Sequence, residues 1–323
     1  MRFAIVGCGL IGQKRLRSLR PGDKVVAVAD PVMARAEALA KEAGDAHALT
    51  DWTQAVERAD VDAVFVSTSN DALARVTLAA VEAGKHVVVE KPGARNPDEL
   101  VPVIAAADRA GVCVQVGFNH RYHPAFQQAR RLLESGALGP LMFIRARYGH
   151  GGRPGYDKEW RARPEISGGG ELLDQGVHLI DLSRWFLGDF TDVQGHIATF
   201  FWDMPAEDNG FLLLRTAQGQ VAWLHATWTE WKNIFSFEIT GRDGKLTVEG
   251  LGGSYGNERL TFYKMLPQMG PPETTIWEYP PSDASWASEF ADYKGGKLGN
   301  IADVDDACAV LGIIAAAYRG SGS

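Results

Sequence analysis

The chain opens with an apolar run, Phe3–Val6, that leads directly into a glycine-rich turn and a predicted helix over 11–19. This order of strand, glycine turn and helix is typical of the first unit of a dinucleotide-binding, doubly wound sheet. The first glycine permits a tight turn, the second leaves room for a pyrophosphate, and the third lets the helix lie close to the strand. The helix N-terminus offers N–H groups and a partial positive charge to phosphates. The residues expected to bind the dinucleotide here are Gly7, Gly9, Leu10, Ile11 and Gly12.

An acidic residue stands where such a unit needs one. A second apolar run, Val25–Ala29, ends in Asp30, 18 positions beyond Gly12. A carboxylate there can accept both ribose hydroxyls of NAD and would repel the extra phosphate of NADP, so we expect NAD rather than NADP. Asp30 also suits the N-cap of the next helix, because Pro31 follows it. The two roles can coexist.

The first 119 residues alternate short apolar runs with Ala-rich helical segments, which predicts right-handed βαβ units and a doubly wound parallel sheet. Its ligand crevice lies at the carboxyl ends of the strands. Predicted strands are Phe3–Val6, Val25–Ala29, Ala63–Val66, His86–Glu90 and Cys113–Val116. Predicted helices are Ile11–Leu19, Val32–Glu42, Asp71–Ala83 and Pro97–Ala110.

The second half has a different pattern, which predicts an α+β domain with a large, mostly antiparallel open sheet. A helix is expected from Pro124 to about Gly136, hairpins at Gln218-Gly219 and Arg242–Gly244, and an edge strand at Leu260–Tyr263. The other predicted strands are Leu141–Tyr148, Phe211–Thr216, Val221–Trp228, Phe235–Thr240 and Lys245–Val248. We expect a cofactor-binding domain over 1–120 and a substrate-binding and oligomerisation domain over 121–323.

The composition of the chain limits the classes of partner that we expect. The formal charge of −7 without a basic run argues against nucleic acid or an anionic membrane as the main partner. No apolar stretch reaches the roughly 18 residues of a membrane span, and the first strand leaves no room for a signal peptide, so we expect a cytoplasmic protein. Eight of the nine tryptophans lie from Trp160 onward, which suits a sheet face that packs on helices or another subunit. We expect a homo-oligomer, either a dimer or a tetramer.

The cysteines do not indicate a metal site. Cys8, Cys113 and Cys308 are far apart and form no C-x-x-C pair, so we interpret them as small core residues. No His or Cys near His178 stands at zinc-like spacing, so no metal is expected.

Two further motifs carry groups suited to chemistry. Lys91 follows the strand His86–Glu90, where its ammonium could hydrogen-bond a reacting hydroxyl or stabilise an alkoxide. The ordinary alternative is a solvated surface lysine. Downstream of three glycines at 168–170, Asp174 and His178 stand four apart on a predicted helix, so the carboxylate could orient the imidazole. A surface pair without catalytic duty fits that spacing equally well.

A basic and aromatic segment, Tyr148–Arg163, precedes these glycines. It includes Arg153, Tyr156, Trp160 and Arg161. Such a loop could hold phosphate and stack a base or sugar, which favours a nucleotide sugar. An ordinary basic surface loop is the alternative.

Taken together, these motifs resemble those of the glucose–fructose oxidoreductase/inositol dehydrogenase/MocA family over nearly the whole chain. The motifs that carry the resemblance are Gly7-x-Gly9-x-x-Gly12, Glu90-Lys91-Pro92, Gly117-Phe118-Asn119-x-Arg121 and Gly168-Gly169-Gly170 leading to Asp174-x-Gly176-x-His178. The resemblance implies an N-terminal Rossmann domain, a C-terminal domain whose open sheet mediates oligomerisation, and nicotinamide-dependent oxidoreduction of a sugar, polyol or nucleotide sugar.

The resemblance also implies roles for single residues. Lys91 contacts the reacting hydroxyl and the cofactor, His178 accepts the proton, and Asp174 binds substrate and assists the histidine. The implied cofactor-binding set is completed by Thr68, Asn70, Glu90, Lys91 and Asn119. With Trp160 and Arg161 of the basic and aromatic loop added, the predicted substrate-binding set is Lys91, Arg121, Trp160, Arg161, Asp174 and His178.

Two places depart from the family pattern. Members commonly have Thr-Pro-Asn-x-x-His where this chain has Thr68-Ser69-Asn70-Asp71-Ala72-Leu73, so a polar group is missing at Leu73. The stretch Ala291–Asp305 looks shortened around Lys294–Lys297.

The sequence therefore predicts an NAD-dependent oxidoreductase that moves hydride between nicotinamide and a secondary hydroxyl of a sugar, inositol or nucleotide sugar. One alternative is an enzyme that holds NAD tightly and oxidises and re-reduces its substrate within one cycle of elimination or hydrolysis. Another is a dinucleotide-binding regulatory protein without catalysis. The fold alone does not choose among these three.

Overall fold

The computed structural model describes residues 1–282, 284–295 and 301–321. These form two compact units: Met1–Phe118, Glu165–Gly168 and Trp286–Gly312 make the first, and Asn119–Pro164, Gly169–Ser285 and Ile313–Ser323 make the second. The domain division at residue 120 stays a prediction. Of the stretch that looked shortened, residues 296–300 lie outside the described residues.

The first unit holds a six-stranded, wholly parallel sheet of order β3-β2-β1-β4-β5-β6. This is the strand order of a doubly wound dinucleotide-binding fold, which confirms the fold class of this half. The strands are β1 (Arg2–Val6), β2 (Lys24–Ala29), β3 (His47–Leu49), β4 (Ala63–Val66), β5 (His86–Val89) and β6 (Val114–Val116). Buried residues run almost without a break along β1, β2 and β4, as expected where helices cover both faces.

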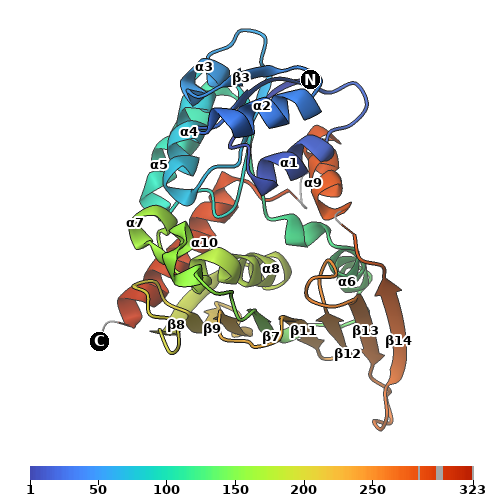
Figure 1. The fold of residues 1–323 in the computed structure, drawn as a ribbon. Coiled ribbons are helices and arrows are strands. Elements are labelled where there is room, and N and C mark those ends of the chain that lie inside the picture. Colours follow the sequence, from blue (N-terminus) through green and yellow to red (C-terminus); the bar gives the residue numbers. More distant parts are fainter. Residues whose placement is uncertain (283, 296–300, 322–323) are drawn as a thin grey trace. The chain divides into compact units, whose positions relative to one another are not determined.

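Helices connect these strands, and Figure 1 shows α4 and α5 side by side. The helical elements of this unit are α1 (Leu10–Arg17), α2 (Met33–Glu42), α3 (Trp52–Val56), α4 (Asn70–Glu82), η1 (Pro97–Glu99), α5 (Val101–Ala110) and α9 (Ala284–Gly295). Helix α10 (Val304–Gly320) contributes residues to both units.

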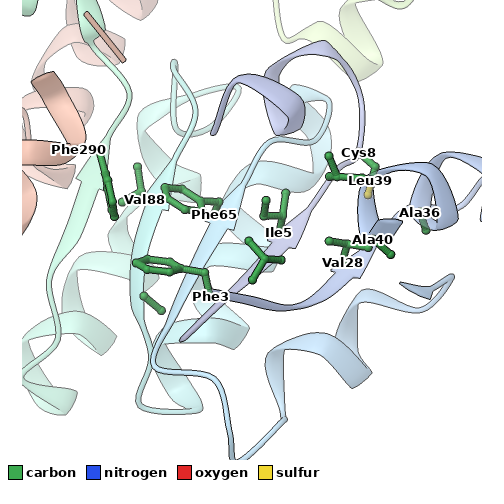
Figure 2. Close-up of a cluster of buried hydrophobic side chains, with 12 residues drawn as sticks. Phe3, Ile5, Cys8, Val28, Ala36, Leu39, Ala40, Phe65, Val88 and Phe290 are labelled. Atoms are coloured by element: carbon green, nitrogen blue, oxygen red, sulfur yellow. The ribbon is translucent and has the colours of Figure 1, made fainter. Parts of the chain in front are cut away.

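Aromatic packing joins α9 to the sheet (Figure 2). Phe3 of β1 and Phe65 of β4 stack with ring centroids 5.0 Å apart, and Phe290 of α9 lies 5.4 Å from each. All three side chains are fully buried. Phe290 thus ties a segment distant in sequence to the two central strands of the sheet.

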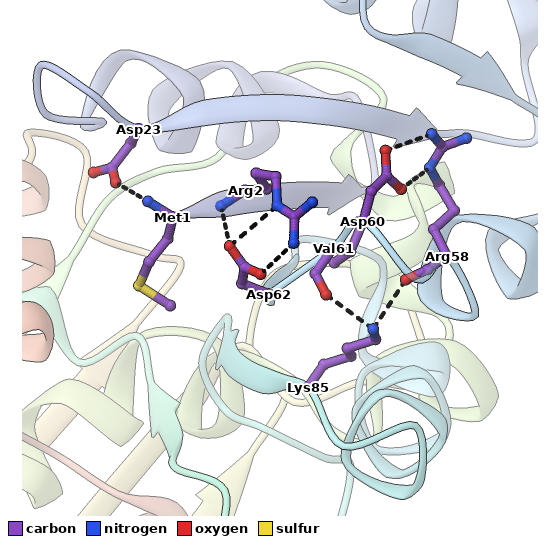
Figure 3. Close-up of polar contacts among 8 residues, drawn as sticks. All are labelled: Met1, Arg2, Asp23, Arg58, Asp60, Val61, Asp62 and Lys85. Carbon is purple, nitrogen blue, oxygen red and sulfur yellow. Dashed lines mark hydrogen bonds and ion pairs between the residues drawn. The ribbon is translucent and has the colours of Figure 1, made fainter.

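Polar contacts hold the amino edge of the same sheet (Figure 3). Arg2, at the start of β1, forms an ion pair of 3.0 Å with Asp62, which precedes β4. Lys85, which precedes β5, donates hydrogen bonds to the carbonyl oxygens of Arg58 and Val61. These contacts lie at the amino edge of the sheet, whereas the glycine turn lies at the opposite, carboxyl edge, where ligands bind in such sheets.

The second unit holds an eight-stranded sheet of order β14-β13-β12-β11-β7-β10-β9-β8. Only β7 and β10 pair in parallel, so the expectation of a mostly antiparallel sheet is confirmed. The strands are β7 (Leu141–Gly149), β8 (Phe190–Ala198), β9 (Asn209–Thr216), β10 (Val221–Thr227), β11 (Ile234–Gly241), β12 (Gly244–Glu249), β13 (Glu258–Lys264) and β14 (Glu273–Tyr279). Both predicted hairpins are present, between β9 and β10 and between β11 and β12.

One face of this sheet contacts helices α6 and α8 (Figure 1). Along β10 and β11, buried residues alternate with more exposed ones, because successive side chains point to opposite faces. The helical elements of this unit are η2 (Asn119–Tyr122), α6 (Pro124–Glu134), η3 (Tyr156–Lys158), η4 (Trp160–Ala162), the π-helical turn η5 (Leu172–Gly176) and α8 (Val177–Leu187), and α7 (Pro164–Ser167) follows η4 in the chain.

Several expectations need correction. The segment Leu260–Tyr263 is not an edge strand, because β14 pairs outside it. Helix α8 does not begin at the glycines: Asp174 lies in the π-helical turn, so the regular four-residue spacing does not apply before Val177. Cys113 is exposed rather than in the core. Within the described residues, no helix has the length and apolar character that a membrane crossing requires.

We expect Phe65→Ala to lower the free energy of unfolding of the first unit by about 3–5 kcal/mol, because it opens a cavity under two aromatic rings. Phe200→Ala, at a side chain that is 65% exposed, is the control and should change stability by less than about 0.5 kcal/mol. Urea unfolding followed by tryptophan fluorescence measures both. A Phe65→Ala loss no larger than that of the control would contradict this account of the core.

Candidate active site

The glycine turn has the geometry that a dinucleotide requires. A Cβ on Gly7, whose φ is +95°, would overlap the carbonyl oxygen of Ser67, and one on Gly12 would overlap that of Gly7. At Gly9 no atom lies within 4 Å of the corresponding position. Gly9 is also the N-cap of α1 and brings no side-chain hydrogen bond to the helix start. Packing therefore explains two of the glycines, and the open side of the third fits a pyrophosphate at the N-terminus of α1.

Asp30 is locked beside this turn. Its Oδ2 accepts a hydrogen bond of 3.0 Å from the backbone N–H of Cys8, and its Oδ1 accepts one of 2.9 Å from Val32. The N-cap of α2 is Val32, so the interpretation of Asp30 as that cap is wrong. A carboxylate has about four acceptor positions, which leaves two for ribose hydroxyls.

The other predicted cofactor residues of the first unit follow the carboxyl ends of β4 and β5. Thr68 donates its hydroxyl to the carbonyl of Ser69, and Asn70 donates its amide to the carbonyl of Ser167 at 2.8 Å. Leu73, where the family commonly has a histidine, is fully buried. Lys91 lies two residues beyond the end of β5 and is half-buried.

A buried ion cluster fixes the residue before Lys91. Arg15 of α1 donates from Nε to Glu90 at 2.7 Å and from its Nη1 to Glu289 of α9 at 2.5 Å. Arg15 and Glu289 are fully buried and Glu90 is 6% exposed. A Cβ on Gly117 would press against the Arg15 guanidinium, which explains that glycine. The pairing of Arg15 with Glu289 was not predicted from the sequence, because no local pattern links positions so far apart.

In the second unit, Asp174 is paired with the loop that precedes it. Arg161 donates from Nε to Asp174 Oδ2 at 3.0 Å, and its guanidinium lies 4.5 Å from the ring centroid of Trp160. Burial lowers the pKa of Arg161, but the Asp174 carboxylate outweighs this effect and the pKa is raised. Three of the predicted substrate-binding residues are therefore in contact.

His178, one turn further along, is buried against other aromatic side chains. Its ring stacks on that of His120 with centroids 3.6 Å apart and planes 14° from parallel. Tyr148 Oη lies 3.3 Å from Nε2 of His120. Asn119, a predicted cofactor residue, contacts His120 Nδ1 through Oδ1 and donates from Nδ2 to Ser285. Arg121 is buried in a bidentate ion pair with Asp181.

Packing also explains two of the three glycines before the π-helical turn. Glu207, which is nearly buried, accepts the N–H groups of Gly170 and Leu172 at 2.7 and 3.1 Å and the hydroxyl of Tyr318 at 2.8 Å. A Cβ on Gly170 would overlap the backbone of Glu207, and one on Gly169 would overlap the Tyr318 hydroxyl. Burial raises the pKa of Glu207, although the Tyr318 and backbone hydrogen bonds act in the opposite direction. Glu207 and Tyr318 were not predicted from the sequence, because both lie far along the chain from the glycines that they contact.

The predicted residues therefore fall into two groups. The first unit carries the glycine turn, Asp30 and Lys91, and the second carries Asp174 and His178. Across residues 1–282, 284–295 and 301–321, no three His, Cys, Asp or Glu side chains group as metal ligands.

Comparison with known families agrees with this division. Residues 1–118 match a model described as an oxidoreductase family with an NAD-binding Rossmann fold, and residues 126–247 match the GFO/IDH/MocA C-terminal domain. D-glucoside 3-dehydrogenase of Escherichia coli is 31% identical over 249 residues, which cover 70% of both chains. The chain belongs to the GFO/IDH/MocA family. This confirms the resemblance read from the motifs, and the first unit is the family's NAD-binding Rossmann fold.

Other similarities in this family are partial or limited to the fold. Levoglucosan dehydrogenase of Pseudarthrobacter phenanthrenivorans is 33% identical over 62% of this chain, and the match spans about half, 51%, of that relative's length. A solved structure of levoglucosan dehydrogenase in complex with NADH superposes with a TM-score of 0.88 at 22% identity, covering 100% of this chain and 97% of that one. It shows that the fold is shared.

The ion cluster predicts a pH-dependent stability. Burial raises the pKa of Glu289 from its usual 4.5 to about 7, Arg15 opposes the shift, and Glu90 adds to it. The folded state therefore holds this proton more tightly than the unfolded chain, so the stability that Glu289 contributes is present below pH about 4.5 and is lost as the pH rises through about 7.

Glu289→Gln cannot ionise. The free energy of unfolding of this variant, relative to the parent, should rise by up to about 3 kcal/mol between about pH 5 and pH 8. Glu42→Gln, at an exposed ion pair with Arg17, is the control and should show a flat difference. Urea unfolding across this pH range measures both, and a pH-independent difference for Glu289→Gln would contradict the assignment.

Proposed function

We propose that this protein is an NAD-dependent dehydrogenase that oxidises a secondary hydroxyl of an uncharged sugar or polyol. The observation that carries the proposal is the buried imidazole of His178, in a chain whose first unit has the NAD-binding turn with Asp30 locked beside it. Family membership supports the same class of reaction.

NAD, when bound, supplies the hydride acceptor. The chain's own residues act on the proton and on the substrate's position. A nitrogen of the His178 imidazole takes the proton from the substrate hydroxyl, while Lys91 donates a hydrogen bond to the same oxygen and stabilises its developing negative charge. The carbon–hydrogen bond supplies the hydride, and the hydroxyl carbon becomes a carbonyl. Asp174, held by Arg161, accepts a hydrogen bond from a second substrate hydroxyl.

The proposal favours NAD over NADP because of charge. Asp30 lies beside the glycine turn as a buried carboxylate, and a 2′-phosphate at the same place would be repelled. The described contacts place no cation against this carboxylate.

Charge pairing in the loop Tyr148–Arg163 favours a free sugar over a nucleotide sugar. Arg161 is paired with Asp174, and Arg153 is paired with Glu159 at 2.6 Å. A diphosphate would have to displace these carboxylates. Trp160, under Arg161, offers an apolar face for a sugar ring.

The open face of the second sheet supports assembly with a second copy of the chain. Trp223 of β10 is 42% exposed and pairs in register with Leu213 of β9, which is 43% exposed. Trp223 lines a hollow together with Arg145, Arg147, Ser236 and Glu238. Apolar side chains next to charges of both signs are a composition that suits pairing of the same face across a two-fold axis.

We expect His178→Asn to lower kcat by about 10²–10⁴-fold, because the proton acceptor is lost, while NADH binding is unchanged. NADH formation with NAD and a panel of inositols, free sugars and glycosides measures kcat, and NADH fluorescence measures binding. His196→Asn, at an exposed histidine of β8, is the control and should behave as the parent. Full activity in His178→Asn would refute its role as the base.

Trp223→Glu should reduce the molar mass in solution to that of one chain, because a charge replaces the apolar centre of the open face. Light scattering after size-exclusion chromatography measures this mass. Met33→Glu, at an exposed side chain of the first unit, should leave the mass unchanged. An unchanged mass for Trp223→Glu, or a parent that is already a monomer, would contradict the proposed interface.

A further inference from the structure

His120 is a second imidazole at the proposed base, and the sequence analysis gave it no role. It lies in η2 (Asn119–Tyr122), whereas His178 lies in α8, so two separate elements of the second unit bring the rings together. Both side chains are buried, with 6% and 3% exposed. The rings overlap face to face, with centroids 3.6 Å apart and planes 14° from parallel.

Polar contacts at both nitrogens hold the His120 ring. Asn119 Oδ1, which can only accept, lies 3.2 Å from His120 Nδ1, and Asn119 Nδ2 donates to Ser285 Oγ at 3.1 Å. The other ring nitrogen, Nε2, lies 3.3 Å from the hydroxyl oxygen of the buried Tyr148. The His120 ring is therefore held from both sides.

We propose that His120 is a positioning residue for His178. The fixed face of its ring holds the His178 imidazole in the one orientation that receives the substrate proton. This inference rests on the proposed function, because it takes His178 as the proton acceptor. It adds that the flat face of the neighbouring ring sets the orientation of the His178 imidazole and, with it, the direction of proton transfer.

The test compares a variant that removes the ring with one that keeps it. His120→Ala loses the stack, whereas His120→Phe keeps a flat ring but loses both hydrogen bonds. His225→Ala is the matched control, because His225 stacks on Phe211 of the neighbouring strand with centroids 4.1 Å apart and planes 12° from parallel. The sugar used is the one that gives the fastest NADH formation in the panel above.

For His120→Ala we expect kcat to fall by about 10–100-fold, with the KM for the sugar and the affinity for NADH changed by less than about threefold. His120→Phe should recover kcat to within about threefold of the parent. His225→Ala should match the parent. A residue needed only for folding would not give this separation of kcat from KM or this rescue by a flat ring.

A second readout does not depend on turnover. In NMR spectra of the free protein, ring current from His120 shifts the ring protons of His178 upfield, and this shift should be lost in His120→Ala and kept in His120→Phe. If His120→Ala does not fold, His120→Leu replaces it, because leucine fills the space without a flat face, and the same losses are expected.

Two kinds of result overturn the inference. A normal kcat in His120→Ala, or a kcat in His120→Phe as low as in His120→Ala, shows that stacking does not position the base. An unchanged His178 resonance in His120→Ala shows that the rings are not stacked in solution. Failure of the proposed function is distinguishable, because His178→Asn would then keep its activity whatever the His120 variants do.

Discussion

The position of the proposed site in the first unit depends on the ion pairs that the guanidinium of Arg15 forms. This guanidinium is fully buried and joins a carboxylate at the carboxyl end of β5 to another on α9. Removing such a charge would leave two buried carboxylates without compensation, which costs about 3–5 kcal/mol for a single broken pair. Arg15 lies on the helix that begins at the glycine turn. Its side chain therefore connects that helix directly to Glu90, the residue before Lys91.

In the second unit, a buried carboxyl group rather than a cation holds the backbone of the site. Glu207 accepts two backbone N–H groups at the start of the π-helical turn, so it holds the segment from which Asp174 projects. Close backbone approach at Gly169 and Gly170 is what allows Glu207 and Tyr318 to reach this segment. A π-helical turn leaves its residues out of regular α-helical register, and such turns are frequent at functional sites. Lys91 and Asp174 thus stand beside backbone that is held by a buried ion cluster and by a buried carboxyl group, respectively.

The parts of this protein that the sequence predicted are those specified locally. The order of strand, glycine turn and helix around Gly9 specifies the fold of the first unit, and alternation along Phe235–Thr240 specifies a strand with one buried face. Short elements escaped prediction: β3 has three residues and no β-branched side chain, and Gly195 breaks the alternation of β8. Apart from the expected pairing of Asp174 with His178, the site was predicted as single residues at motif positions and not as contacts. Arg15 with Glu289, Glu207 with Gly170, and His120 with His178 are brought together only by tertiary packing.

In the proposed reaction, hydride passes from a sugar carbon to NAD and leaves the protein as NADH. The most direct measurement uses the best sugar of the panel with deuterium at the carbon that bears the reacting hydroxyl, and determines the mass of the NADH released. The account predicts one deuterium in each NADH, formed in equal amount to the oxidised sugar. NADH without deuterium, or a product that forms while no NADH is released, would contradict it and indicate an internal redox cycle instead.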